Sequence, residues 1–345
     1  MKAGLVGYTQ TGKTTLFNAL TGQSAQTGGG GRGENIGTIK VPDGRIDALS
    51  AIFKPKKTIY AEVVFVDVPG PRGKGGGFDG GTLASLREAD ALVLVLRGFA
   101  GLDGSDPDPV RELDDFESEL ILNDLVVVER RLERLKKENA ATVERAVLER
   151  CLDALSNEQA LRLLDLSAED ERAISSFAFL SRRPLLVVLN ASESNVAVPI
   201  PEKLVRAAAE RRLGVMAACA EIEAEIAALA PDEQREFLSD LGLDDAASAR
   251  LVRSAYSLLD YISFFTVGED EVRAWTVKRG SKAPRAAGRV HSDIERGFIR
   301  AEVMKYEEFI EVGSEAKMKT LGKLRVEGKE YVVEDGDIMH FRFNV

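Results

Sequence analysis

Residues 7–15 (GYTQTGKTT) constrain the fold more than any other part of the chain. They follow an apolar run at residues 3–6 and lead into residues with helical spacing. Gly7 and Gly12 allow backbone N–H groups to converge on an anion at points where a Cβ would collide with it. A strand, a glycine-containing loop and a helix in this order predict a phosphate-binding P-loop, and a chance match in a surface loop is the alternative.

The residues of this loop have distinct expected roles. Lys13 supplies a cation for the phosphates, and the hydroxyl of Thr14 can coordinate Mg²⁺. The helix that begins near Gly12 adds the partial positive charge of its N-terminus. We expect Lys13 to be the catalytic cation and Mg²⁺ to be the cofactor. The expected phosphate contacts are Gln10, Thr11, Gly12, Lys13, Thr14 and Thr15.

Length and composition are those of an ordinary globular protein. The 345 residues are enough for two domains. A net charge of −10 argues against a protein that coats nucleic acid through bulk charge. We therefore expect no DNA partner, and any RNA contact has to be local.

Cysteine usage and hydropathy indicate a compartment. Cys151 and Cys219 are too few for a disulfide framework, which favours buried thiols in a reducing environment. The N-terminus runs directly into the first predicted strand, and no stretch approaches 18 apolar residues. We expect a cytoplasmic protein with no membrane partner.

Apolar runs alternate with helical patterns along the chain, which predicts an α/β fold with a mostly parallel sheet. Ligands bind at the carboxyl ends of the strands in such sheets. The predicted strands cover residues 3–6, 36–41, 58–67, 91–96 and 185–189, and predicted helices cover 45–53 and 82–89.

A segment without a strand pattern, residues 109–166, interrupts this alternation. Leu125, Val128, Leu132 and Leu135 repeat at the spacing of a coiled-coil seam, and a second leucine run follows a polar stretch. We expect an inserted α-helical coiled-coil hairpin over residues 108–178. Its charges fit either a solvated surface or contact with a partner, and the length of the insertion favours a partner.

A second nucleotide element, residues 67–70 (DVPG), ends an apolar strand. Asp67 lies at the carboxyl edge of the predicted sheet, where it can hold Mg²⁺ through water. Gly70 can direct its N–H group toward a γ-phosphate, and the glycine-rich residues 73–81 are typical of a mobile nucleotide-sensing switch. A strand-ending Asp in an ordinary turn is the alternative.

The third element, residues 190–193 (NASE), directly follows the strand 185–189. Translation-factor-like GTPases carry Asn-Lys-x-Asp here, and that Asp accepts hydrogen bonds from guanine N1–H and the 2-amino group, which adenine lacks. Glu193 is one methylene too long for this pose, and Ala191 lacks the aliphatic stem that covers the purine. We therefore expect adenine, with base contacts from Asn190, Ala191 and Glu193.

Together these motifs resemble the YchF/Obg-like ATPases, translation-factor-class P-loop proteins with an Asn-x-x-Glu base motif and a preference for ATP over GTP. The resemblance implies a P-loop nucleotide-binding domain over residues 1–262, a terminal TGS domain of β-grasp fold over 263–345, and contact of the Ala220 backbone with the base. Alternation after a turn at residues 334–337 independently predicts a small strand-rich module. The similar stretches are residues 54–57, 219–226, 265–266, 272–277, 297–303 and 335–345.

The first switch departs from the family pattern. Residues 28–34 align with the stretch that holds the family's Mg²⁺-binding Thr, and they contain no Thr. Thr27 and Thr38 are the candidate replacements, and Thr38 is not assigned because it lies inside a predicted strand, beyond the switch. We expect a weaker hold on the metal.

The second switch departs from Ras-like enzymes. Pro71 stands where those enzymes use a Gln to orient water, and proline cannot polarise water. Charge from Lys13, Mg²⁺ and Arg72 or Lys74 then has to stabilise the transition state. We expect slow intrinsic hydrolysis of ATP.

These features predict an ATP-binding, slowly ATP-hydrolysing switch protein. Its association with ribosomes or ribosomal RNA, through the hairpin and the TGS domain, follows from the resemblance alone. A nucleotide-gated adaptor that binds ATP without significant hydrolysis is one alternative, and a GTPase is another. Basic residues between 273 and 289 fit RNA contact or a solvated face. The two histidines, His291 and His340, fit a structural or surface role.

Overall fold

The computed structural model describes residues 1–25, 34–70, 77–138, 142–195, 198–241, 243 and 245–344. Its internal contacts divide the chain into two compact units, and the structure contains two six-stranded sheets. The first unit comprises Met1–Ile39 and Val64–Leu251, and the second comprises Lys40–Val63 and Val252–Val345.

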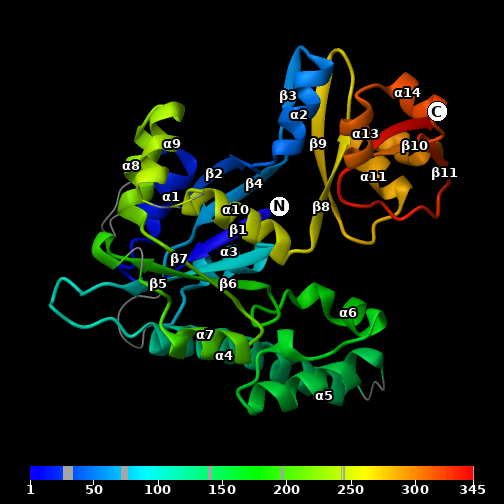
Figure 1. Ribbon diagram of the computed structural model, residues 1–345. Helices are drawn as coiled ribbons and strands as arrows, with labels where there is room; N and C mark the ends of the chain where they lie inside the picture. Colours follow the sequence, from blue (N-terminus) through cyan, green and yellow to red (C-terminus); the bar gives the residue numbers. More distant parts are fainter. Residues whose placement is uncertain are drawn as a thin grey trace. The chain divides into compact units, whose positions relative to one another are not determined.

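The sheet of the first unit has the strand order β2-β4-β1-β5-β6-β7 (Figure 1). β1 pairs in parallel with β4 and β5, and β6 pairs in parallel with β5 and β7. The α/β fold with a mostly parallel sheet is therefore confirmed. The strands are β1 (Lys2–Val6), β2 (Asn35–Lys40), β4 (Glu62–Asp67), β5 (Ala91–Gly98), β6 (Leu185–Ala191) and β7 (Gly214–Ala218).

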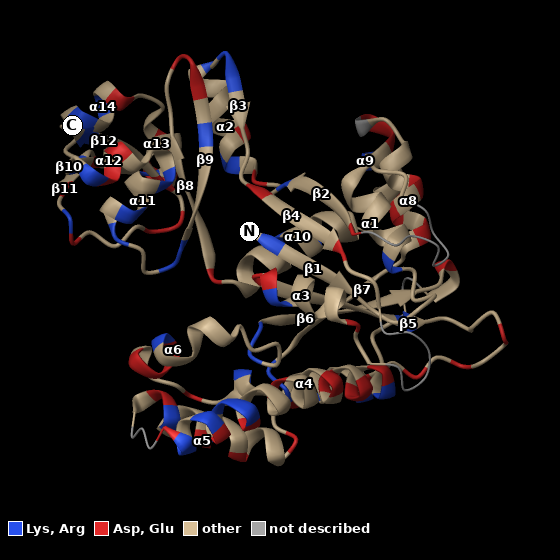
Figure 2. Ribbon diagram, turned by 180° about the vertical axis from the view of Figure 1, so that it is seen from behind, with Lys and Arg blue, Asp and Glu red and all other residues tan. Residues whose placement is uncertain are grey.

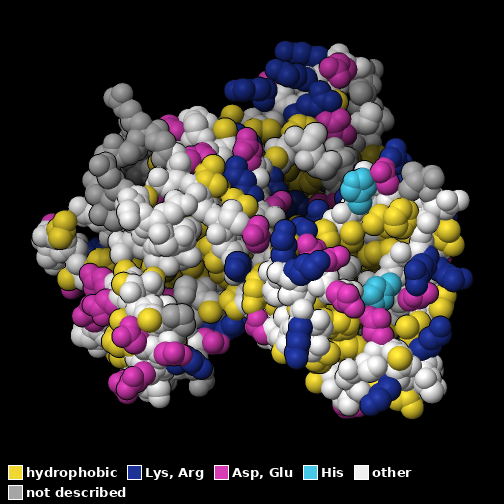
Figure 3. All heavy atoms as spheres, turned by 90° about the horizontal axis from the view of Figure 1, so that it is seen from above, with side chains coloured by type: hydrophobic (Ala, Val, Ile, Leu, Met, Phe, Trp, Pro, Cys, Tyr) yellow, Lys and Arg dark blue, Asp and Glu magenta, His cyan; other side chains and the backbone are white. Residues whose placement is uncertain are grey.

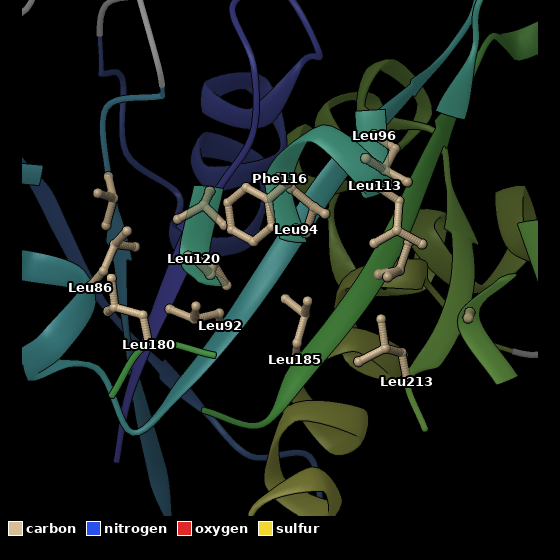
Figure 4. Close-up of a cluster of buried hydrophobic side chains, with 14 of the residues drawn as sticks. Leu86, Leu92, Leu94, Leu96, Leu113, Phe116, Leu120, Leu180, Leu185 and Leu213 are labelled. Atoms are coloured by element: carbon tan, nitrogen blue, oxygen red, sulfur yellow. The ribbon is translucent and has the colours of Figure 1, made fainter. Parts of the chain in front are cut away.

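The central strands are apolar along their whole length because helices cover both faces of the sheet. In Figure 1, α1 and α8 lie on one side, and α4 and α7 lie on the other. Figure 4 shows leucines of β5 and β6 packed against Phe116 and its neighbours on α4. The helices of this unit outside the inserted hairpin are α1 (Lys13–Thr21), α3 (Gly80–Glu88), α7 (Glu202–Glu210), α8 (Ala220–Ala228) and α9 (Pro231–Asp240), and α10 (Ala247–Leu258) begins in this unit and ends in the second.

Two strand predictions differ from the structure. The predicted strand 58–67 is interrupted at residues 60–61, because β3 (Lys57–Ile59) pairs with β9 whereas β4 pairs with β1. The sequence pattern also misses β7. Its residues, GVMAA, are poor in β-branched side chains, and the strand forms by pairing with β6.

The inserted segment contains the predicted pair of helices, α4 (Pro109–Lys137) and α5 (Val143–Ser156). Val128, Leu132 and Leu135 are buried against apolar side chains of α5, and Leu125 is partly buried beside them. The first half of α4 instead packs against the sheet. The hairpin is thus a continuation of a core helix. It is followed by α6 (Ala168–Ile174) and by single turns at Leu161–Leu163 and Ser175–Phe177.

Charge along α4 follows the helix dipole. Acidic side chains predominate in its first half, and Arg and Lys predominate in its last turns (Figure 2). α5 carries both signs, and Arg131 of α4 forms a bidentate ion pair with Glu144 of α5. Both cysteines are buried, as expected.

The second unit contains a sheet with the order β11-β10-β12-β8-β9-β3 and the helix α2 (Gly44–Phe53). The strand-rich C-terminal module predicted from alternation is therefore present. The segment 40–63 belongs to this unit because β3 pairs with β9, although the sequence analysis places it in the domain 1–262. The limits 108–178 and 263–345 stay predictions. The remaining elements are β8 (Tyr261–Thr266), β9 (Glu271–Lys278), α11 (Ala283–Val290), α12 (Ser292–Arg296), β10 (Phe298–Lys305), α13 (Tyr306–Val312), α14 (Glu315–Thr320), β11 (Arg325–Glu327) and β12 (Asp337–Phe343).

Candidate nucleotide-binding site

The P-loop connects the carboxyl end of β1 to the first residue of α1, Lys13. Gln10 (φ 69°) and Gly12 (φ 80°) take left-handed backbone conformations, and Thr11 Oγ1 donates a hydrogen bond to the Tyr8 carbonyl oxygen at 3.1 Å. The N–H groups in the first turn of α1 have no acceptors within the helix. The loop therefore ends at a helix terminus that suits an anion.

Three glycines allow backbone segments to approach closely at this site. A Cβ on Gly7 would lie 2.6 Å from the carbonyl oxygen of Val95, and a Cβ on Gly12 would collide with the side chain of Asn190. A Cβ on Gly70 would collide with the backbone carbonyl of Gly7. Gly70 thus lies directly against the P-loop, because β1 and β4, the strands that precede the two elements, are neighbours in the sheet.

The carboxylate of Asp67, at the end of β4, is surrounded by polar side chains. Lys13 Nζ forms an ion pair with Oδ1, and Thr14 Oγ1 donates to Oδ2 at 3.0 Å. Asn35, the first residue of β2, donates from Nδ2 to the same Oδ2 at 3.2 Å. Asp67 is only 5% exposed. The structure therefore brings Lys13, Thr14 and Asp67 together and adds Asn35.

This cluster fits a Mg²⁺ ion that arrives with a nucleotide. Mg²⁺ in phosphate sites takes few protein oxygens and completes its shell with phosphates and water. The hydroxyl of Thr14 and the carboxylate of Asp67 are adjacent oxygens of this kind. Among the residues that the structure describes, no group of three or more His, Cys, Asp or Glu side chains could hold a metal ion by itself.

Asn190 links the P-loop to the predicted base site. Its Nδ2 donates to the Thr11 carbonyl oxygen at 2.8 Å, and its Oδ1 accepts from the Ala220 N–H at 2.9 Å. Asn190 is 3% exposed, so both bonds are made in a dry environment. The Ala220 backbone is expected to contact the base, and in this structure its N–H group donates to Asn190 Oδ1.

Ala191 and Glu193 lie two residues apart and differ in burial. Ala191 is the buried last residue of β6, whereas Glu193 is exposed at the start of a single turn, Glu193–Asn195. Burial is the largest cause that raises the pKa of the Cys219 thiol, and the Glu193 carboxylate contributes to the same shift.

A small cavity of about 90 Å³ adjoins these residues. The Glu223 carboxylate in its wall accepts N–H groups of Ala247 at 2.7 Å and Ser248 at 2.8 Å. Glu223 therefore caps α10, and its charge is satisfied within the unit. The lining residues are Ala191, Ala217, Ala218, Cys219, Ile222, Glu223, Leu243, Ala247 and Arg250.

The first half of α4 contacts the C-terminal end of the second switch segment. Glu119 Oε1 accepts the Phe78 N–H at 3.3 Å, and the rings of Phe78 and Phe116 meet edge to face with centroids 5.8 Å apart. Tyr8 of the P-loop packs against the same apolar cluster. Burial is the largest cause that raises the pKa of the Tyr8 hydroxyl, and carboxylates of α4 add to it. The inserted helix is thus in contact with two nucleotide elements.

Several predicted features lie outside the described residues. These are Thr27, most of the stretch 28–34, Pro71 with Arg72 and Lys74, and the first part of the glycine-rich loop. Thr38 is described, and it is an exposed residue of β2. The sequence assigns no role to Asn35, and its contact with Asp67 is found only in the structure. Its position between the first switch and the predicted strand 36–41 is the available signal.

The basic residues between 273 and 289 are mostly paired with acids. Arg279 pairs with Asp260, Lys282 with Glu330, and Arg285 with Glu295. Arg273 lies near Glu271 and stacks on Trp275. In Figure 3, several Lys and Arg side chains gather at the top of the view, whereas elsewhere on this face they are intermixed with Asp and Glu, and both histidines are at the surface. The pairing of the basic residues between 273 and 289 with acids favours a solvated face for this segment.

In the described part of the chain, no helix is both long and apolar enough to span a membrane.

Comparison with known proteins gives matches along the whole chain. A sequence-family model described as "50S ribosome-binding GTPase" matches residues 2–131, and the model YchF-GTPase_C, described as "Protein of unknown function (DUF933)", matches residues 261–344. The chain is 38% identical to "Ribosome-binding ATPase YchF" of Bacillus subtilis over 364 residues, covering 100% of both chains. It is 40% identical to the protein of the same name from Haemophilus influenzae over 360 residues, covering 100% of this chain and 99% of the relative.

A solved structure is similar to both units. It is described as the Schizosaccharomyces pombe YchF GTPase, and the match has a TM-score of 0.88 with 28% sequence identity. The match covers 99% of this chain and 97% of the other. The α/β P-loop fold and the presence of the C-terminal unit thus agree with an independently known protein.

Proposed function

Because the chain belongs to the YchF family, we propose that it is an ATP-binding P-loop switch protein that hydrolyses ATP slowly and associates with ribosomes. The observation that carries the proposal is the convergence of Lys13, Thr14 and Asp67 at the end of a P-loop that Asn190 joins to the base motif. The bacterial relatives above are named ribosome-binding ATPases. Association with ribosomes would place this protein in the cytoplasm.

The phosphate contacts belong to the P-loop and the start of α1. Backbone N–H groups of residues 10–15 bind the phosphates, and Gly70 supplies a further N–H group beside Gly7. Lys13 exchanges its ion pair with Asp67 for contact with the phosphates, where its charge stabilises negative charge in the transition state.

Mg²⁺ is proposed to be held by Thr14 and Asp67 together with the nucleotide. When bound, Mg²⁺ neutralises phosphate charge and polarises the phosphoryl oxygens. Thr14 presents its hydroxyl oxygen, and Asp67 acts directly or through a water molecule. Because Asp67 already has three side-chain partners, its carboxylate is held in one orientation before nucleotide binds.

Recognition of adenine rests on the side chains at the end of β6. Guanine recognition requires a carboxylate that accepts two adjacent N–H groups. Glu193 is exposed at the start of a turn, and its side chain is one methylene longer than this pose needs. Ala191 is buried and offers no stem over a purine. Asn190, Ala191, Glu193 and Ala220 are proposed as the base-binding residues, with Ala220 contributing its backbone.

The partner surface is proposed to include the helical hairpin. α4 contacts Phe78 at the end of the second switch segment through Glu119 and Phe116, and its second half forms the seam with α5. A nucleotide-dependent change near Gly70 would thus reach the base of a helix whose far end is available to a partner. The ion pairing of residues 273–289 makes the C-terminal unit the weaker candidate for electrostatic RNA contact.

Steady-state release of phosphate from ATP and from GTP tests the enzymatic part. We expect slow release from ATP that exceeds a Lys13→Ala blank, with less release from GTP. Equal or faster turnover of GTP would refute the assignment of adenine. ATP affinity with no phosphate above the blank in single-turnover assays would identify a nucleotide-gated adaptor. Co-sedimentation with ribosomes, with and without ATP, tests the partner.

A further inference from the structure

Asn35 occupies an unusual position between the first switch and the metal-binding carboxylate. It is the first residue of β2, directly after the stretch in which the family's switch Thr is missing. Its Nδ2 lies 3.2 Å from Asp67 Oδ2, and Thr14 Oγ1 lies 3.0 Å from the same oxygen. Among the described residues, Asn35 is the residue of β2 whose side chain donates a hydrogen bond to the Asp67 carboxylate.

The two oxygens of the Asp67 carboxylate have different partners. Oδ1 belongs to the ion pair with Lys13, and Oδ2 accepts the two neutral donors. In the nucleotide complex, Lys13 contacts the phosphates and the Thr14 oxygen contacts the metal ion. Asn35 is then the one partner in this cluster that contacts Asp67 and no ligand. A neutral amide that donates to a ligating carboxylate orients it without competing for the metal charge.

We propose that Asn35 is a positioning residue that orients Asp67 for Mg²⁺ in the nucleotide complex and so takes over part of the task of the missing switch Thr. Asn35 acts through Asp67 and does not itself touch the nucleotide. The proposal rests on the proposed function, because it assumes that the cluster binds Mg²⁺ with ATP. It also means that Mg²⁺ binding depends on the start of β2, where the first switch ends.

The test measures the binding of a fluorescent ATP analogue, methylanthraniloyl-ATP, over a range of Mg²⁺ concentrations. Asn35→Ala removes the donor, and Asn35→Leu removes it while keeping the side-chain volume. For both variants we expect the Mg²⁺ concentration at half-maximal enhancement of binding to rise about tenfold. Affinity in EDTA should stay within about twofold of the original protein, because the phosphate contacts of the P-loop are retained.

Thr38→Ala provides the matched control. Thr38 belongs to the same strand and is exposed, and its side chain points to the face opposite that of Asn35 because side chains alternate along a strand. We expect its Mg²⁺ dependence to match that of the original protein. If Thr38→Ala shifts the Mg²⁺ concentration at half-maximal enhancement as much as Asn35→Ala does, the proposal is overturned, because Thr38 would then contribute to metal binding.

Three further outcomes separate the proposal from its premises. Equal loss of affinity with and without Mg²⁺ in both Asn35 variants would overturn it and indicate a role in folding alone. An unchanged Mg²⁺ midpoint in both variants would also overturn it, while leaving the proposed function intact. If the original protein fails to bind the ATP analogue at any Mg²⁺ concentration, both the proposed function and this inference are refuted.

Discussion

Asn190 Nδ2 lies 2.8 Å from the carbonyl oxygen of Thr11, a residue 179 positions earlier in the chain. The same carboxamide accepts the N–H group of Ala220 through Oδ1. One buried side chain therefore ties the P-loop, the end of β6 and the start of α8 into a single unit. This side chain thereby fixes the proposed phosphate-binding and base-binding elements relative to one another.

Replacing Asn190 should weaken both the fold and nucleotide binding. Asn190→Ala leaves the Thr11 carbonyl and the Ala220 N–H buried without partners, at about 1–3 kcal/mol for each group. We expect a lower melting temperature and at least a tenfold loss of ATP affinity by equilibrium fluorescence. Ser192→Ala, two residues along, alters only a hydrogen bond with Ser194 and should change neither quantity. Equal behaviour of the two variants would contradict the role of Asn190.

Gly70 should not tolerate a methyl group. A Cβ there collides with the Gly7 backbone carbonyl, which cannot move without displacing the P-loop. Gly70→Ala should therefore lower ATP affinity by at least tenfold while the protein remains folded by circular dichroism. Gly80→Ala is the control, because a Cβ on Gly80 has no atom within 4 Å in the described structure. Retention of full ATP affinity by Gly70→Ala would contradict the close approach.

The hydrogen bond from Phe78 N–H to Glu119 should restrain the end of the second switch segment. Glu119→Ala removes the acceptor, whereas Glu119→Gln keeps an oxygen in its place. Loss of one hydrogen bond of about 1 kcal/mol corresponds to a roughly fivefold faster amide exchange at Phe78. Hydrogen exchange read by mass spectrometry should show this in the alanine variant only. Faster exchange in both variants, or in neither, would argue against the contact.

Removing one partner of the buried ion pair of Glu117 and Arg162 should destabilise the protein more than replacing both partners with apolar residues. Burial is the largest cause that raises the pKa of Glu117 and lowers that of Arg162, and Glu117 Oε1 and Arg162 Nε lack hydrogen-bond partners in the described structure. Arg162→Met leaves a buried carboxylate unpaired, at about 3–5 kcal/mol. The double variant Glu117→Leu/Arg162→Met should recover most of this loss in urea unfolding.

An exposed pair on the same helix supplies the control for that experiment. Arg111 and Asp115 lie one turn apart on α4 at 3.7 Å, and both side chains are largely exposed. Arg111→Met should cost less than about 1 kcal/mol, since water screens such pairs. If the double variant at Glu117 and Arg162 is no more stable than Arg162→Met, the stability of the protein requires the ion pair itself, and apolar residues do not replace it.

The Cys151 thiol should be unreactive in the native protein. Burial raises its pKa to about 11, and the side chain is inaccessible. Iodoacetamide at pH 8 should alkylate Cys151 in urea but not in buffer, as measured by mass spectrometry. Because the raised pKa means that the fold favours the neutral thiol, this stabilisation is present below the ordinary thiol pKa. It is lost as pH rises through about 11, and Cys151→Ala should lack that loss.

Local patterns were sufficient to predict much of this protein. The P-loop depends on neighbouring residues, with Gly12 and Lys13 between a strand and a helix, and the coiled-coil seam repeats at a fixed spacing. Both were confirmed by the structure. β7 was missed because its small side chains carry no strand signal, and the break in residues 58–67 was missed because it depends on which partner strand each half pairs with.

The contacts of Asp67 show where prediction from local patterns ends. That Asp67 ends a strand near a P-loop followed from the sequence itself, because apolar spacing and the Asp-x-x-Gly pattern are local properties. Which side chains meet at its carboxylate was decided only by tertiary structure, since Lys13, Asn35 and Asp67 are distant in the chain and meet through the pairing of β1, β2 and β4. Hydrogen bonds between distant residues depend on positions in space, and no spacing along the chain encodes them.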